Sequence, residues 1–146
     1  SDACEASLWA GIAALATATR LNEVGRAVEK SIRNSGRYGI LLDYIGHGVG
    51  RSMHEDPAVF NYQTRDLGPV VEPGLVIAIE PMITAGSEKV TILADEWTIS
   101  TKDGSDGSHW EHTVALHAGG IWVLTAEDGG EAGLAKYGVK PVPVNL

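Results

Sequence analysis

Twelve residues in the first half of the chain, Gly46 to Pro57, bring together two histidines, two carboxylates and three glycines. Glycines on both sides of His47 permit a sharp turn that holds the imidazole clear of the backbone, where it can reach a metal ion. His47 and His54 are seven residues apart, whereas the helical His-Glu-x-x-His zinc motif places its histidines closer together. The pair is therefore expected to act from a loop. A glycine-rich turn that contains histidines by chance is the alternative.

A carboxylate interrupts the end of an apolar run of strand-forming residues, Leu75 to Met82. Glu80 stands directly before Pro81, and an ionised carboxylate beside a buried strand needs a cation, several hydrogen-bond donors or a proton. Ligation of a metal ion would satisfy it. The alternative is a solvated strand end.

A second carboxylate, Glu111, lies in a segment that alternates in the manner of a half-buried strand. The period of two places His109, Glu111 and Thr113 on one face. One imidazole and two carboxylates on separate elements suit a divalent transition ion, with Mn, Fe, Co or Zn favoured over a thiolate-preferring metal. Taken alone, Glu111 would be an ordinary solvated position on an edge strand.

The segments that must position these residues are two helices followed by strands. An apolar stripe after a capping residue, Ser1 or Asp2, predicts the first helix, and residues 22–36 carry the start and stop signals of the second. An irregular segment is expected at 58–73, and strands at 38–45, 75–82, 89–93, 97–101, 110–117 and 121–125. This order predicts an α+β fold in which two helices precede a curved antiparallel sheet with the candidate ligands on one side.

Composition limits the class of protein. A chain of 146 residues, 44% of them hydrophobic, is long enough for one domain with a real core. The net charge of -8 and the scattered positions of 11 Lys and Arg argue against a nucleic-acid partner. The single cysteine, Cys4, and the lack of a long apolar run indicate a cytoplasmic protein without a membrane partner or signal peptide.

The motifs resemble type I methionine aminopeptidases in their order and intervals, over a stretch from about Leu21 to Thr125. The matching segments are Gly46–Arg51 with His54–Pro57, Glu80–Met82, Trp97-Thr98 with Thr101 and Asp103, and Trp110–Thr113. His47, His54, Glu80 and Glu111 are shared with the wider pita-bread metalloenzymes, which include prolidase and aminopeptidase P. The Trp97-Thr98 and His112-Thr113 pairs favour the methionine aminopeptidase branch.

The resemblance implies a pita-bread fold and metal-assisted removal of N-terminal methionine from methionyl peptides and nascent chains. It implies two divalent ions, Co, Mn, Fe or Zn, with His47, Glu80 and Glu111 as ligands. Glu80 would also accept a proton from water, and His54 would donate a hydrogen bond to the substrate. Met53 and Trp97 would wall the methionine pocket. At Met53, His109 and Trp110 the sequence departs from the aromatic, Gln and Tyr residues that are commoner in the family.

The two aspartate ligands of such enzymes precede the first helix seen here and have no counterpart before His47. Residues 1–126 are therefore expected to form the C-terminal half of a catalytic domain that is inactive alone, with the missing N-terminal half as a candidate partner. Residues 127–146 are interpreted as a tail, extended over 139–146 and either packed along the body or mobile. The alternatives are a proline-directed pita-bread peptidase and a non-catalytic pita-bread binding domain.

Overall fold

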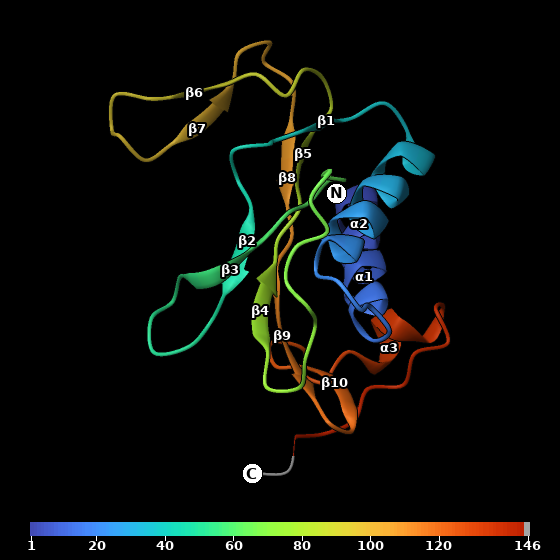
Figure 1. The fold of residues 1–146 in the computed structure, drawn as a ribbon. Helices are drawn as coiled ribbons and strands as arrows, with labels where there is room; N and C mark the ends of the chain where they lie inside the picture. Colours follow the sequence, from blue (N-terminus) through green and yellow to red (C-terminus); the bar gives the residue numbers. More distant parts are fainter. Residues whose placement is uncertain (145–146) are drawn as a thin grey trace.

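The computed structural model describes residues 1–144 and arranges helices on one side and strands on the other (Figure 1). The helices are α1 (Asp2–Leu15), α2 (Asn22–Ser35) and α3 (Glu131–Ala135). The strands are β1 (Gly39–Ile40), β2 (Gly46–Gly48), β3 (Glu55–Val59), β4 (Val76–Ile79), β5 (Met82–Thr84), β6 (Val90–Ile92), β7 (Ile99–Thr101), β8 (Gly107–His109), β9 (His112–His117) and β10 (Gly120–Val123). The predicted α+β class with two leading helices is confirmed. Within residues 1–144 no helix is long and apolar enough to cross a membrane.

The two leading helices pack against each other and cover the strands. The predicted bounds of α2 are confirmed, because the helix begins at Asn22 and ends before Gly36. A close approach at Gly11 brings α1 against both neighbours: a Cβ there would lie 2.6 Å from Val28 Cγ2 and 3.4 Å from Ile79 Cγ2. The core between helices and sheet is therefore continuous from α2 through α1 to β4.

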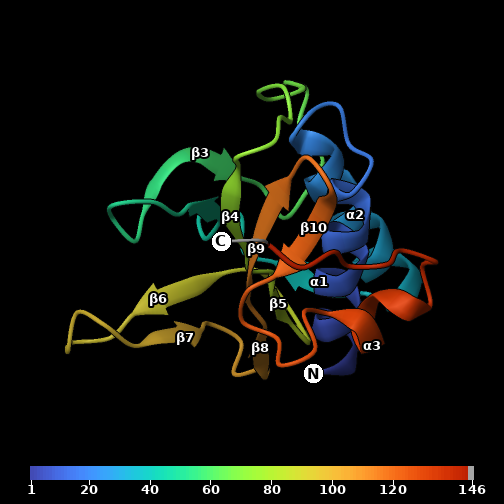
Figure 2. The same ribbon diagram turned by 90° about the horizontal axis from the view of Figure 1, so that it is seen from below.

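The strands form three antiparallel groups. The main sheet has the order β10-β9-β4-β2-β3, a second has the order β1-β5-β8, and β6 pairs with β7 alone. Figure 2 shows the β6–β7 hairpin projecting away from the helices. The prediction of antiparallel strands is confirmed, but the expected single curved sheet is divided.

Two of the predicted strands are each interrupted at a candidate ligand. Residues 75–82 form β4 and β5 with a break at Glu80 and Pro81, and the strand predicted over 110–117 begins only at His112, because Trp110 and Glu111 lie between β8 and β9. Pro81 has no N–H to donate to a ladder. Pairing keeps one register across the break, since Ile79 lies opposite His112 and Met82 lies opposite His109. Glu80 and Glu111 consequently face each other at the junction of the two sheets.

The prediction of one strand over residues 38–45 is wrong. β1 pairs with β5, whereas β2 pairs with β3 and β4. The chain must cross from one sheet to the other, and it does so through a turn at Leu42 and Asp43. The predicted irregular segment also begins later than expected, because β3 continues to Val59 and only then does the irregular path start.

Residues 127–144 pack along the body rather than extending into solvent. Leu134 of α3 is fully buried, and the Tyr137 hydroxyl donates to the Ala6 carbonyl at 3.1 Å. The Val142 N–H donates to the Ile121 carbonyl at 2.9 Å, so the packed alternative for residues 139–144 is correct. Asn145 and Leu146 lie outside the described residues, and the boundary between 126 and 127 stays a prediction.

A pH-dependent contact organises the loop after β7. Asp103 accepts hydrogen bonds from the Ser87 N–H at 2.7 Å and from the Ser105 N–H at 3.0 Å. These donors, Ser87 first, lower the pKa of Asp103 from 3.8 to about 2. Because the folded-state pKa lies below the unfolded one, the charged side chain stabilises the fold above pH 3.8 and loses this effect as the pH falls towards about 2.

We expect the difference in free energy of unfolding between the wild type and Asp103→Asn to change with pH over the same range. It should be constant near neutral pH, decrease as the pH falls through the interval from 3.8 to about 2, and reach a second constant value below it. Urea unfolding of both proteins across this range measures it. A difference that stays constant throughout would show that the ionised form of Asp103 adds no stability.

Candidate metal centre

His47 lies on β2 and not in a loop as expected, with the backbone of Gly46 paired to β3 and that of Gly48 to β3 and β4. Its Nδ1 is 2.9 Å from the Gly48 carbonyl oxygen. A carbonyl only accepts hydrogen bonds, so Nδ1 carries the proton in the neutral ring and Nε2 presents a lone pair. His47 is thus oriented as a metal-binding imidazole.

The Nε2 lone pair of His47 faces a carboxylate. Nε2 lies 3.4 Å from Glu80 Oε1, and the two side chains are only 15% and 12% exposed. Two acceptors at this separation repel unless a proton or a metal ion lies between them. Ligand atoms about 2.1 Å from a common ion are about 3.4 Å apart at the tetrahedral angle. The observed separation therefore fits a shared metal ion.

Glu111 completes a group of three. One ligand atom each from His47, Glu80 and Glu111 lies within 4.8 Å of the others. Like charges opposite each other on paired strands destabilise a sheet, and a divalent cation would remove this repulsion. The structure thus brings together the three residues that were predicted as ligands, although ligation itself stays a prediction.

His54 lies beside this group, in the bend directly before β3. Its ring centroid is 4.2 Å from that of His47, and the residue is exposed. In the loop that leads to it, Glu55 Oε1 accepts the Ser52 N–H at 2.7 Å. A depression next to the two rings is lined by Ile45, Gly46, His47, His54, Glu55, Asp56 and Ala58.

The two expected pocket residues are not brought to this depression. Met53 is 73% exposed, and Trp97 is 87% exposed in the connection between β6 and β7. Trp97 therefore lies outside the core. Contact of either side chain with a bound methionine stays a prediction.

Sequence reasoning missed two residues that contact Glu80. Asn61 lies in the segment that was expected to be irregular, but it is fully buried and its Nδ2 donates to the carbonyls of Glu80 at 3.1 Å and Tyr44 at 3.2 Å. No local pattern indicates that burial. His109 Nε2 lies 3.4 Å from Glu80 Oε2. The period of two, which places His109 on the same face as Glu111, was the available signal.

The Glu80 carboxylate also changes the proton affinity of His109. Its hydrogen bond is the largest effect and raises the pKa of His109, against a smaller opposing effect of burial. Glu80 is thus held between two imidazoles, one on each carboxylate oxygen.

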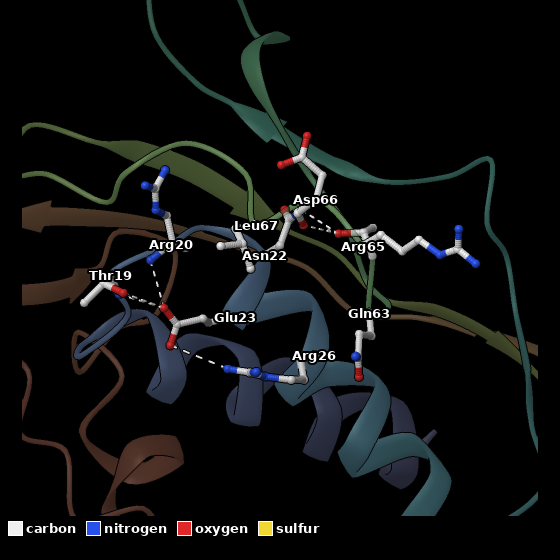
Figure 3. Close-up of a pocket in the computed structure, with 10 residues that line it drawn as sticks. Thr19, Arg20, Asn22, Glu23, Arg26, Gln63, Arg65, Asp66 and Leu67 are labelled. Atoms are coloured by element: carbon white, nitrogen blue, oxygen red, sulfur yellow. Dashed lines mark hydrogen bonds and ion pairs between the residues drawn. The ribbon is translucent and has the colours of Figure 1, made fainter.

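A second depression, at the start of α2, has a structural explanation. Figure 3 shows Glu23 turned back towards the residues that precede the helix. Glu23 Oε1 accepts the N–H groups of Thr19 at 3.0 Å and Arg20 at 2.9 Å. These hydrogen bonds, that of the Arg20 N–H first, lower the pKa of Glu23 and fix the turn that precedes α2. The orientation of Glu23 is thus explained by the turn that leads into α2.

One imidazole and two carboxylates held between strands form a donor set that suits a divalent metal ion. Residues 1–118 match the model of metallopeptidase family M24, and the chain belongs to this family. Membership implies divalent metal ions. It also confirms the pita-bread fold that the motifs predicted.

Individual relatives agree with this assignment. The chain is 46% identical to "Methionine aminopeptidase 1" of Mycobacterium tuberculosis over 130 residues, which are 86% of this chain and 49% of that protein. The crystal structure of methionine aminopeptidase from Thermotoga maritima matches with a TM-score of 0.80 and 36% identity, covering 86% of this chain and 50% of that one. The chain spans about half the length of these relatives, as expected for half of such an enzyme.

A more distant match concerns the fold alone. Prolidase from Pyrococcus furiosus matches with a TM-score of 0.58 and 23% identity, covering 86% of this chain and 31% of that one. The pita-bread arrangement is therefore shared with proline-directed enzymes, but the similarity to methionine aminopeptidases is greater in both sequence and structure.

Proposed function

We propose that this chain provides half of a methionine aminopeptidase, which hydrolyses the first peptide bond of methionyl peptides and nascent chains in the cytoplasm. The centre would hold two divalent ions, Co, Mn, Fe or Zn, with His47, Glu80 and Glu111 among the ligands. The main supporting observation is the His47–Glu80 pair, in which two acceptor atoms face each other 3.4 Å apart. Similarity to methionine aminopeptidases favours this substrate over a proline-directed one.

The residues of the chain have distinct roles in this reaction. Divalent ions, when bound, would activate a water molecule and polarise the scissile carbonyl. His47 presents Nε2 because Gly48 holds its Nδ1 proton, and Glu80 accepts a proton from the attacking water. His54 lies exposed beside His47 and can donate a hydrogen bond to the carbonyl oxygen of the substrate. Met53 and Trp97 would contact the methionine side chain in the complete enzyme.

Titration calorimetry of Co(II) into the metal-free chain tests the centre. We expect His47→Ala and Glu111→Ala to weaken binding by about 100-fold or more, because each removes a ligand. His117→Ala is the matched control, since His117 contacts the Val142 carbonyl at the other end of β9 and should leave the affinity unchanged. Equal Co(II) affinity in the wild type and His47→Ala would refute the proposed centre.

Methionine release from a Met-Ala-Ser peptide tests the activity. We expect no release by this chain alone, because the aspartate ligands implied by the resemblance are absent from it. Mixing with the preceding half of the M. tuberculosis relative should give release that depends on metal and on His47. Release by the chain alone would contradict the half-enzyme proposal, and metal-independent release would contradict the mechanism.

A further inference from the structure

Among the described residues, Glu80 is the only candidate ligand with an imidazole beside each of its two carboxylate oxygens. Oε1 lies 3.4 Å from His47 Nε2, and Oε2 lies 3.4 Å from His109 Nε2. His47 belongs to the group of mutually close ligand atoms, whereas His109 does not. The two imidazoles therefore stand in different relations to a bound ion.

The position of His109 follows from strand pairing. His109 is the last residue of β8 and lies opposite Met82 of β5, two residues beyond Glu80. The Trp110 N–H donates to the Pro81 carbonyl at 3.4 Å and continues this alignment past the end of the strand. Diagonal neighbours on paired strands are within reach of long side chains. The contact between His109 and Glu80 is thus built into the register of the sheet.

We propose that His109 is a positioning residue for the metal centre: its Nε2–H holds Glu80 Oε2, so that Oε1 remains directed at the ion shared with His47. This inference rests on the metal centre proposed above. A carboxylate with one oxygen held by a donor loses less rotational freedom when it binds a metal, and such outer contacts orient metal ligands generally. Asn61 fixes the Glu80 backbone through its carbonyl, and His109 fixes the end of the side chain.

His109 lies at the edge of the centre, next to solvent. His109 is 43% exposed, whereas His47 and Glu80 are 15% and 12% exposed. His109 approaches Glu80 from the solvent side, and its Nε2 lies beside Oε2, the oxygen that His47 does not face. A donor in this place restrains the carboxylate without occupying a position on the ion.

Two substitutions of His109 distinguish the effect of losing the N–H donor from the effect of changing the size of the side chain. His109→Gln keeps an N–H donor, whereas His109→Leu keeps a side chain of similar size and removes the donor. We expect His109→Leu to weaken Co(II) binding by about 10-fold to 100-fold with unchanged stoichiometry, and His109→Gln to restore most of the affinity. The visible absorption bands of bound Co(II) should be the same in the wild type and His109→Gln, because the ligands are unchanged. Urea unfolding of each variant checks that the fold is intact.

Several results would overturn the inference. Wild-type affinity in His109→Leu would show that the contact does not position Glu80. Weak binding by both variants, with altered Co(II) bands in His109→Gln, would make His109 a ligand instead. If His47→Ala has no effect on binding, the proposed centre itself fails. If only the His109 variants have no effect, the centre stands and the positioning role alone falls.

A measurement without metal provides an independent test. Long-range ¹H–¹⁵N spectra of the metal-free protein should show a proton on His109 Nε2, and Glu80→Ala should shift its resonance. A ring protonated at Nδ1 only, or a resonance unaffected by Glu80→Ala, would contradict the proposed hydrogen bond.

Discussion

Replacing Gly48 with alanine is expected to lower the free energy of unfolding by about 3 kcal/mol or more and to remove metal binding. Gly48 on β2 lies between Glu55 of β3 and Ile77 of β4. A Cβ at this position would overlap the Asp56 carbonyl oxygen and lie 2.6 Å from its carbonyl carbon. The obstacle is backbone and cannot rotate away, so β2 and β3 must separate and displace His47.

Gly107→Ala is the matched control for this substitution. Gly107 also lies on a strand, β8, but a Cβ there would meet only the Ile83 carbonyl oxygen at an ordinary 3.8 Å. Urea unfolding and Co(II) titration of both variants measure the two effects. Equal stability of the two variants would show that the close approach of β2 and β3 is not required.

Replacing Glu80 with glutamine is expected to weaken Co(II) binding by about 100-fold or more, because a neutral amide is a poor ligand for a divalent ion. The metal-free protein should respond in the opposite direction. Glu80 is largely buried and faces Glu111 across the strand pair. Above the pH range in which histidines titrate, removing its charge should raise the free energy of unfolding by up to about 1 kcal/mol.

An exposed carboxylate provides the control for charge alone. Glu127→Gln makes the same change in net charge at a solvent-exposed position, and it should alter neither metal affinity nor stability by a measurable amount. Calorimetry with Co(II) and urea unfolding without metal give the two quantities. A Glu80→Gln protein that binds Co(II) normally would exclude Glu80 as a ligand.

The helices were predictable because their signals are local. Residues 22–36 contain a start signal, an apolar stripe and a terminal glycine, and α2 has these bounds. The candidate ligands were also visible in the sequence, since a carboxylate beside an apolar strand is costly unless it is paired. His47, Glu80 and Glu111 do lie together in the structure.

The strands were less predictable because pairing is not a local property. Residues 38–45 are mostly apolar, which favours one strand, yet only Gly39 and Ile40 pair in a sheet, and the chain then turns at Leu42 and Asp43 towards β2 of the other sheet. The exposure of Trp97 likewise depends on a hairpin that projects from the body (Figure 2). Neither feature follows from composition or period.

By itself the sequence determined the chemical types of the site residues, the two helices and the M24 motifs, because these depend on residue identity and short spacing. Only the tertiary structure decided that Glu80 and Glu111 face each other and that His109 reaches the free oxygen of Glu80. The physical reason is register: a single alignment of paired strands, maintained across the break at Pro81, sets which side chains meet.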